Sequence, residues 1–131
     1  GMIETIQIPI RLDAWSNRRG HPMALHRLKL GERRATGIAW AFGSKPIPSF
    51  PCTITCVRLS PGRLDDDNLP TAFKVVRDHL VEKCFGLPSD HSKHGITWIY
   101  EQESARTHSA RIEIEADTFT YGRAASRRWT K

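Results

Sequence analysis

The segment LDDDNLPTAFKVVRDHLVEKC, residues 64–84, decides the fold, because it joins an acidic run to the clearest helix pattern in the chain. Five side chains recur at spacings of four, three, four and four residues, which predicts one buried helix face: Leu69, Phe73, Val76, Leu80 and Cys84. Asp67 or Asn68 can cap this helix, and Pro70 suits its first turn. Gly86 and Pro88 lie just beyond its end.

Three consecutive carboxylates, Asp65 to Asp67, precede the helix in a chain with 20 Lys and Arg against 14 Asp and Glu. Adjacent carboxylates repel unless a cation takes up their charge, and Mg²⁺ binds one or two carboxylates together with substrate phosphates. In an extended backbone, Asp65 and Asp67 would point to one side and Asp66 to the other. Asp65 and Asp67 therefore form the candidate metal pair. The alternative is an acidic cap that only complements the helix dipole.

Further elements are predicted from apolar periodicity. Ile6, Ile8 and Ile10 alternate with polar residues and predict a strand. A helix follows over residues 23–42, with Leu25, Leu28, Ile38 and Phe42 as expected core positions. After a loop at 45–51, strands are predicted at 52–59, 96–100 and 110–115, the last two antiparallel and joined by a polar connection. The order is strand, helix, strand, helix, strand, strand, which indicates a single α+β domain over residues 1–131.

The net charge of +6 is concentrated in residues 11–45 and in a basic tail at 122–131. This pattern favours a nucleic-acid backbone as partner, although a solvated basic surface is the alternative. The candidate contacts are Asn17, Arg18, Arg19, Arg33, Arg34, Arg127 and Arg128. Trp15, beside the basic loop, is a candidate for stacking on bases.

No apolar run approaches the ~20 residues of a membrane span, and no signal-peptide pattern follows Gly1, which resembles a tag scar, so we expect a cytoplasmic protein. The odd count of three cysteines argues against a disulfide framework. A zinc site from Cys52, Cys56, His91 and His94 is a weaker alternative, because the two cysteines fall in a predicted strand.

The run Asp65 to Leu69, read as D-x-D-N-L before an amphipathic helix, is followed by Lys74, Asp78, Gly86 and Asp90. This combination resembles the signature of the RusA-like Holliday junction resolvases, often encoded by phages and prophages, over roughly a third of the chain. Two positions differ from the family pattern. Thr71 stands where the family usually has a Lys, with Lys74 one turn later, and Asp90 is a single Asp where the family tends to have two.

The resemblance implies a small α+β homodimer, with a mixed sheet packed by two helices, that binds branched DNA and cuts four-way junctions during recombination and repair. It implies a hydrolase that uses Mg²⁺, with Mn²⁺ as a substitute, held by Asp65, Asp67 and Asp90. Lys74 would stabilise charge in the transition state. Two other functions stay open: a junction- or duplex-binding protein of the same fold that has lost cleavage, and an RNA-binding module.

Overall fold

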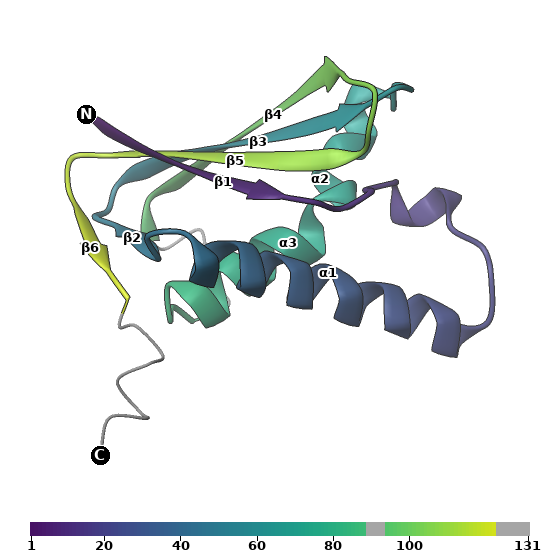
Figure 1. The fold of residues 1–131 in the computed structure, drawn as a ribbon, viewed down its shortest axis with the longest axis horizontal. Helices are drawn as coiled ribbons and strands as arrows, with labels where there is room; N and C mark the ends of the chain where they lie inside the picture. Colours follow the sequence, from purple (N-terminus) through teal and green to yellow (C-terminus); the bar gives the residue numbers. More distant parts are fainter. Residues whose placement is uncertain (89–93, 123–131) are drawn as a thin grey trace.

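The structure is a computed structural model, which describes residues 1–88 and 94–122. It contains a four-stranded sheet and a two-stranded sheet (Figure 1). The strands are β1 (Met2–Ile8), β2 (Pro46–Pro48), β3 (Cys52–Ser60), β4 (Ile96–Ser104), β5 (Ser109–Ala116) and β6 (Phe119–Tyr121). The helices are α1 (Pro22–Phe42), α2 (Leu69–Ala72) and α3 (Lys74–His79), with 3₁₀ turns η1 (Trp15–Asn17) and η2 (Asp66–Asn68) and a π turn η3 (Leu80–Cys84). None of the described helices combines the length and the apolar character that a bilayer span requires.

The larger sheet is mixed, with strand order β1-β5-β3-β4, and this confirms the predicted α+β class. β3 is parallel to β4 and antiparallel to β5. The chain leaves β3, passes through α2 and α3 and returns as β4, which is the kind of crossover that parallel neighbours require. β4 and β5 run in opposite directions, as expected, but β3 lies between them, so the polar connection at 105–108 is not a hairpin.

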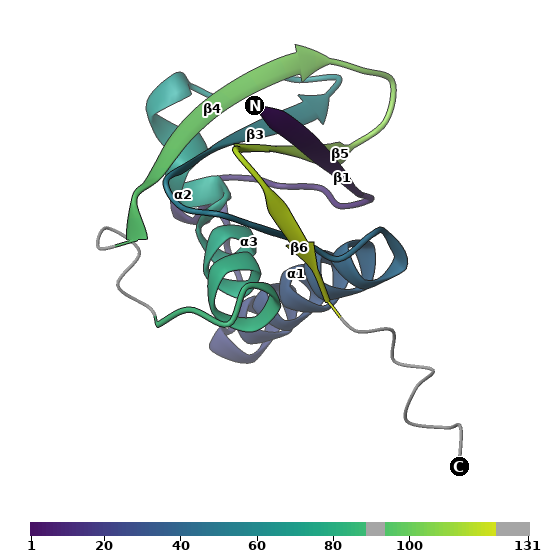
Figure 2. The same ribbon diagram turned by 90° about the vertical axis from the view of Figure 1, so that its left-hand side faces the viewer.

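One face of the sheet packs against α1 and α3, which lie on the same side of it (Figure 2). The strand side chains that point to these helices form the core, including Ile6, Ile54, Cys56, Ile112 and Ile114. The other face carries charged residues, and Arg111 of β5 pairs there with Glu103 of β4 and with Glu113. This alternation of buried and polar residues along β5 is what a sheet with one covered face requires.

The predicted helix of residues 69–84 is divided into α2, α3 and η3, yet its predicted buried face is confirmed. All five positions, Leu69, Phe73, Val76, Leu80 and Cys84, are at most 7 % exposed. The backbone departs from α geometry at Phe73, where φ is −90° and ψ is 0°. Gly86, with φ of +74°, ends this helical stretch as its position predicted.

α1 confirms the predicted helix at 23–42, but its expected core positions are wrong. Leu25 is half-buried, and Leu28, Ile38 and Phe42 are 47, 49 and 88 % exposed. Glu32 and Thr36 are buried instead, flanked by half-buried Ala35 and Ala39. The helix therefore approaches the sheet through small side chains and one buried carboxylate, and this choice of face depends on tertiary packing.

The loop predicted at 45–51 contains a short strand, β2, which pairs with β6. Two of its three residues are Pro46 and Pro48, which cannot donate a backbone hydrogen bond. Because prolines within a segment argue against a strand, the sequence predicted a loop there. Ile47 lies between them, opposite Thr120.

Candidate functional site

The acidic segment, defined as Asp65, Asp66 and Asp67, follows β3 and the Pro61-Gly62 turn, and it leads into α2. All three carboxylates are exposed. Neither Asp65 before η2 nor Asn68 before α2 makes a side-chain capping hydrogen bond, so the predicted cap at Asp67 or Asn68 is wrong. The reason is local geometry, because Asn68 already has helical backbone angles and an N-cap residue needs extended ones.

The expected alternation of side chains also fails within this segment. Asp65 is extended, with φ of −61° and ψ of 141°, but Asp66 already belongs to the 3₁₀ turn η2. Side chains no longer alternate once the chain turns helical, so strand geometry does not group Asp65 with Asp67. Their proposed shared role therefore rests on their chemistry and position.

Asp66 has a structural role that distinguishes it from its neighbours. Its Oδ1 accepts hydrogen bonds from Arg63 Nη2 at 3.1 Å and from Gln102 Nε2 at 3.1 Å. The Asp65 and Asp67 carboxylates have no hydrogen-bond or ion-pair partner within residues 1–88 and 94–122. Two of the three carboxylates are thus free to accept a cation.

Gln102 of β4 holds the start of the acidic segment. Its Oε1 accepts from Leu64 N at 2.9 Å, and its Nε2 donates to Leu64 O at 2.7 Å. Arg58 of β3 supports the same turn, because its Nη1 donates to Gly62 O at 3.0 Å and approaches Gln102 Oε1 at 3.4 Å. The acidic segment is therefore fixed from two neighbouring strands.

Arg58 and Gln102 were missed by the sequence analysis. Arg58 is 5 % exposed, its Nε donates to Leu12 O at 2.7 Å, and its Nη2 lies 3.5 Å from Asp13 Oδ1. Burial lowers the pKa of its guanidinium from the ordinary value. The sequence did contain an indication of this role. Arg58 is a charged residue on the inward face of a strand rich in β-branched side chains, where a charge is rarely buried without a partner. Gln102 carried no comparable signal.

Lys74, the predicted catalytic cation, begins α3 and is exposed. Its Nζ donates to Asp78 Oδ2 at 2.9 Å, an (i, i+4) pair on the helix surface. Thr71, one turn earlier, donates its hydroxyl to Asn68 O at 2.9 Å. The short helix α2 therefore lies between the acidic segment and Lys74 along the chain.

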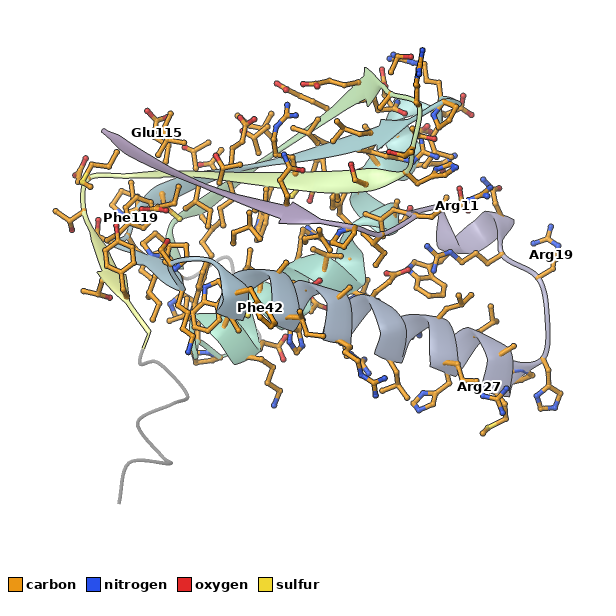
Figure 3. The ribbon with its side chains drawn as sticks, viewed as in Figure 1. Arg11, Arg19, Arg27, Phe42, Glu115 and Phe119 are labelled. Carbon is orange, nitrogen blue, oxygen red and sulfur yellow. The ribbon has the colours of Figure 1, made fainter. Side chains whose placement is uncertain are left out.

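The predicted DNA contacts are in several different environments. Asn17, Arg19, Arg33 and Arg34 are exposed, and Arg19 extends outward from the loop before α1 (Figure 3). Arg18 is instead only 9 % exposed, and its Nη1 donates to Glu32 Oε2 at 2.6 Å. This leaves Arg18 little surface to offer a phosphate. Arg127 and Arg128 lie outside the described residues, as does the predicted metal ligand Asp90.

Glu32 is the buried partner of Arg18, at 4 % exposure. Burial raises the pKa of this carboxyl, and the Arg18 hydrogen bond opposes that shift. Arg18 also donates to Asp13 O at 2.9 Å and lies 3.7 Å from the centre of the Trp15 ring. These contacts fix the loop after β1 against α1.

The cysteines are buried free thiols. Burial raises the thiol pKa to about 11 for Cys52 and to about 12 for Cys56 and Cys84. Raised pKa values do not favour the thiolate that binds zinc. His91, part of the zinc alternative, lies outside the described residues.

Within the described part of the chain, no three His, Cys, Asp or Glu side chains come together as a metal site. Mg²⁺ nevertheless needs only one or two protein carboxylates beside substrate oxygens, and Asp65 with Asp67 fits that donor set. In comparisons with known proteins, no protein-family model matched the chain and no curated protein matched it.

Proposed function

We propose that this protein is a Mg²⁺-dependent, structure-selective endonuclease of the RusA-like type that resolves four-way DNA junctions. The observation that carries the proposal is the pair of exposed carboxylates, Asp65 and Asp67, without partners among the described residues. Each adjoins Asp66 in the sequence, and neighbouring carboxylates repel one another unless a cation takes up their charge. The D-x-D-N-L resemblance supports the same function.

In this function Asp65 and Asp67 would hold the metal ion, with Asp90 as the third ligand that the resemblance implies. The chemistry that bound Mg²⁺ supplies is a water of lowered pKa and neutralisation of charge on the scissile phosphate. Hydrolysis forms a bond from a water oxygen to phosphorus, breaks one P–O ester bond and passes a proton of the water to the released alcohol. Asp66 does not take part, because Arg63 and Gln102 hold its carboxylate.

Lys74 has the role of a cation near the reacting phosphate. Its ammonium is exposed and its partner Asp78 is on the same helix. A phosphate can therefore compete with Asp78 for the ammonium without breaking a buried contact. Loss of such a charge commonly costs a few kcal/mol in the barrier.

The active form in this proposal is a homodimer, because a two-fold DNA junction suits a two-fold protein. α1 presents apolar side chains that no described residue covers, above all Phe42, which is 88 % exposed. Phe42 and Ile38 line a groove together with Gln7, which belongs to β1, and Pro9, which follows the end of that strand. An apolar surface of this kind favours contact with a second copy.

A DNA-binding protein that lacks cleavage is the second candidate. The observation in its favour is the ion pair of Lys74 with Asp78, which reduces the free charge near the acidic segment.

One experiment separates the two functions. The purified protein is incubated with a synthetic four-way junction, with Mg²⁺ or with EDTA, beside the variants Asp67→Asn and Asp66→Asn. We expect symmetric nicks that need Mg²⁺, loss of cleavage but retained binding in Asp67→Asn, and retained cleavage in Asp66→Asn, whose amide oxygen still accepts from Gln102. Binding without nicks would establish the second candidate, and full activity of Asp67→Asn would refute the metal role.

A further inference from the structure

A basic groove lies between α1 and α3, on elements that are about forty residues apart in the chain. Its lining residues are Trp15, Lys29, Arg33, Thr71, Lys74, Val75 and Asp78, and its volume is about 290 Å³. Lys29 and Arg33 are one helical turn apart on α1, and Lys74 faces them from α3. We call this feature the α1–α3 groove.

The charge of the groove is positive. Its lining holds three cations and one acid, Asp78, which is already paired with Lys74 at 2.9 Å. Lys29 and Arg33 are exposed and form no ion pair with a described residue. Two full positive charges therefore remain for an anion.

The wall of the groove is apolar and held in place. The Trp15 ring has the Arg18 guanidinium 3.7 Å from its centre and the Lys29 ammonium 5.4 Å from its centre. Arg18 is itself fixed by Glu32 and by the carbonyl of Asp13. Because Arg18 already stacks on this ring, the groove suits a small charged group better than a stacked base.

The groove lies next to the acidic segment. Thr71 lines it, and the same hydroxyl donates to the carbonyl of Asn68, the residue that follows Asp67. A nucleic-acid strand that reaches Asp67 is therefore within one helical turn of the groove.

We propose that the α1–α3 groove binds a backbone phosphate of DNA adjacent to the phosphodiester at the acidic segment, with Lys29 and Arg33 as its ligands. This inference rests on the proposed DNA-binding function and adds the site that orients the strand. Lys29 was not among the contacts predicted from the sequence. The contact is to phosphate, so it contributes affinity and register but no base preference.

The test is the salt dependence of binding to a synthetic four-way junction in EDTA. Fluorescence anisotropy is measured between about 50 and 200 mM salt for wild type, Lys29→Ala, Arg33→Ala and the double variant. Arg27→Ala is the matched control, because Arg27 is an exposed arginine of α1 that does not line the groove and lies on the side of the helix away from the sheet (Figure 3). Thermal unfolding of each variant verifies that the fold is intact.

The groove neutralises one phosphate, so losing it in the double variant should reduce the slope of log K against log salt by about 0.9, and each single variant should lose no more than that. The slope of Arg27→Ala should stay as in wild type. A folded double variant with the wild-type slope would overturn the groove proposal while leaving the nuclease proposal intact. Wild-type protein that binds the junction but does not cleave it with Mg²⁺ would refute the nuclease, and the slopes would still decide the groove. Wild-type protein that binds no DNA would overturn both.

Discussion

Replacing Gln102 with Ala should loosen the acidic segment without disturbing the core. The Gln102 side chain is half-buried near the C-terminal end of β4. It makes two hydrogen bonds to the Leu64 backbone and one to Asp66. A net contribution of about 1 kcal/mol for each backbone contact, and less for the exposed contact to Asp66, predicts a loss of about 2 kcal/mol. For a domain of this size that corresponds to a fall in Tm on the order of 8 °C.

The effect on cleavage follows from the same contacts. Without the Gln102 side chain, the backbone around Leu64 is less ordered before the metal and substrate bind. Fixing that backbone on binding costs about 1–2 kcal/mol of conformational entropy for each residue. A cost of about 2 kcal/mol corresponds to an approximately 30-fold loss of cleavage at limiting Mg²⁺. Junction binding in EDTA should be unchanged, because the side chain does not belong to the basic surface.

Urea unfolding and cleavage titrated with Mg²⁺ measure the two effects, with Glu101→Gln as the control from an exposed neighbouring position on β4. Unchanged stability of Gln102→Ala would refute the hydrogen-bond reasoning. Reduced stability with an unchanged Mg²⁺ dependence would show that Gln102 supports the turn but does not position the site.

Three further predictions concern the rest of the fold. Because burial raises the Glu32 pKa above 4.5, the stability that its proton contributes is complete below about pH 4.5 and is lost as pH rises through the raised value. Glu32→Gln should therefore gain stability relative to wild type as pH rises above about 4.5 in urea unfolding, and a constant difference would contradict this. The buried thiols, with pKa values raised to about 11 or 12, should resist a thiol reagent at about pH 8 until the protein unfolds, so fast labelling of native protein would contradict their burial. Phe42→Glu should convert the proposed dimer to folded monomer in sedimentation, and a persistent dimer would exclude Phe42 from the interface.

Local patterns in the sequence were sufficient for the elements of this protein. The spacing from Leu69 to Cys84 predicted a buried helical face that the structure confirms, although the helix is divided at Phe73. The strand at 52–59 and the helix at 23–42 were also correctly located. Such patterns succeed because helix and strand periodicity depend on which side chains must leave water.

The sequence by itself determined the α+β class, the main helices and strands, and the position of three adjacent carboxylates before a helix. Only the tertiary structure decided that β3 separates β4 from β5, that α1 buries Glu32 and exposes Phe42, and that Gln102 holds the acidic segment. It also brought Lys29 and Arg33 to Lys74 in one groove. The physical reason is that periodicity reports which residues of one element are buried, whereas contacts between elements far apart in the chain depend on how those elements pack.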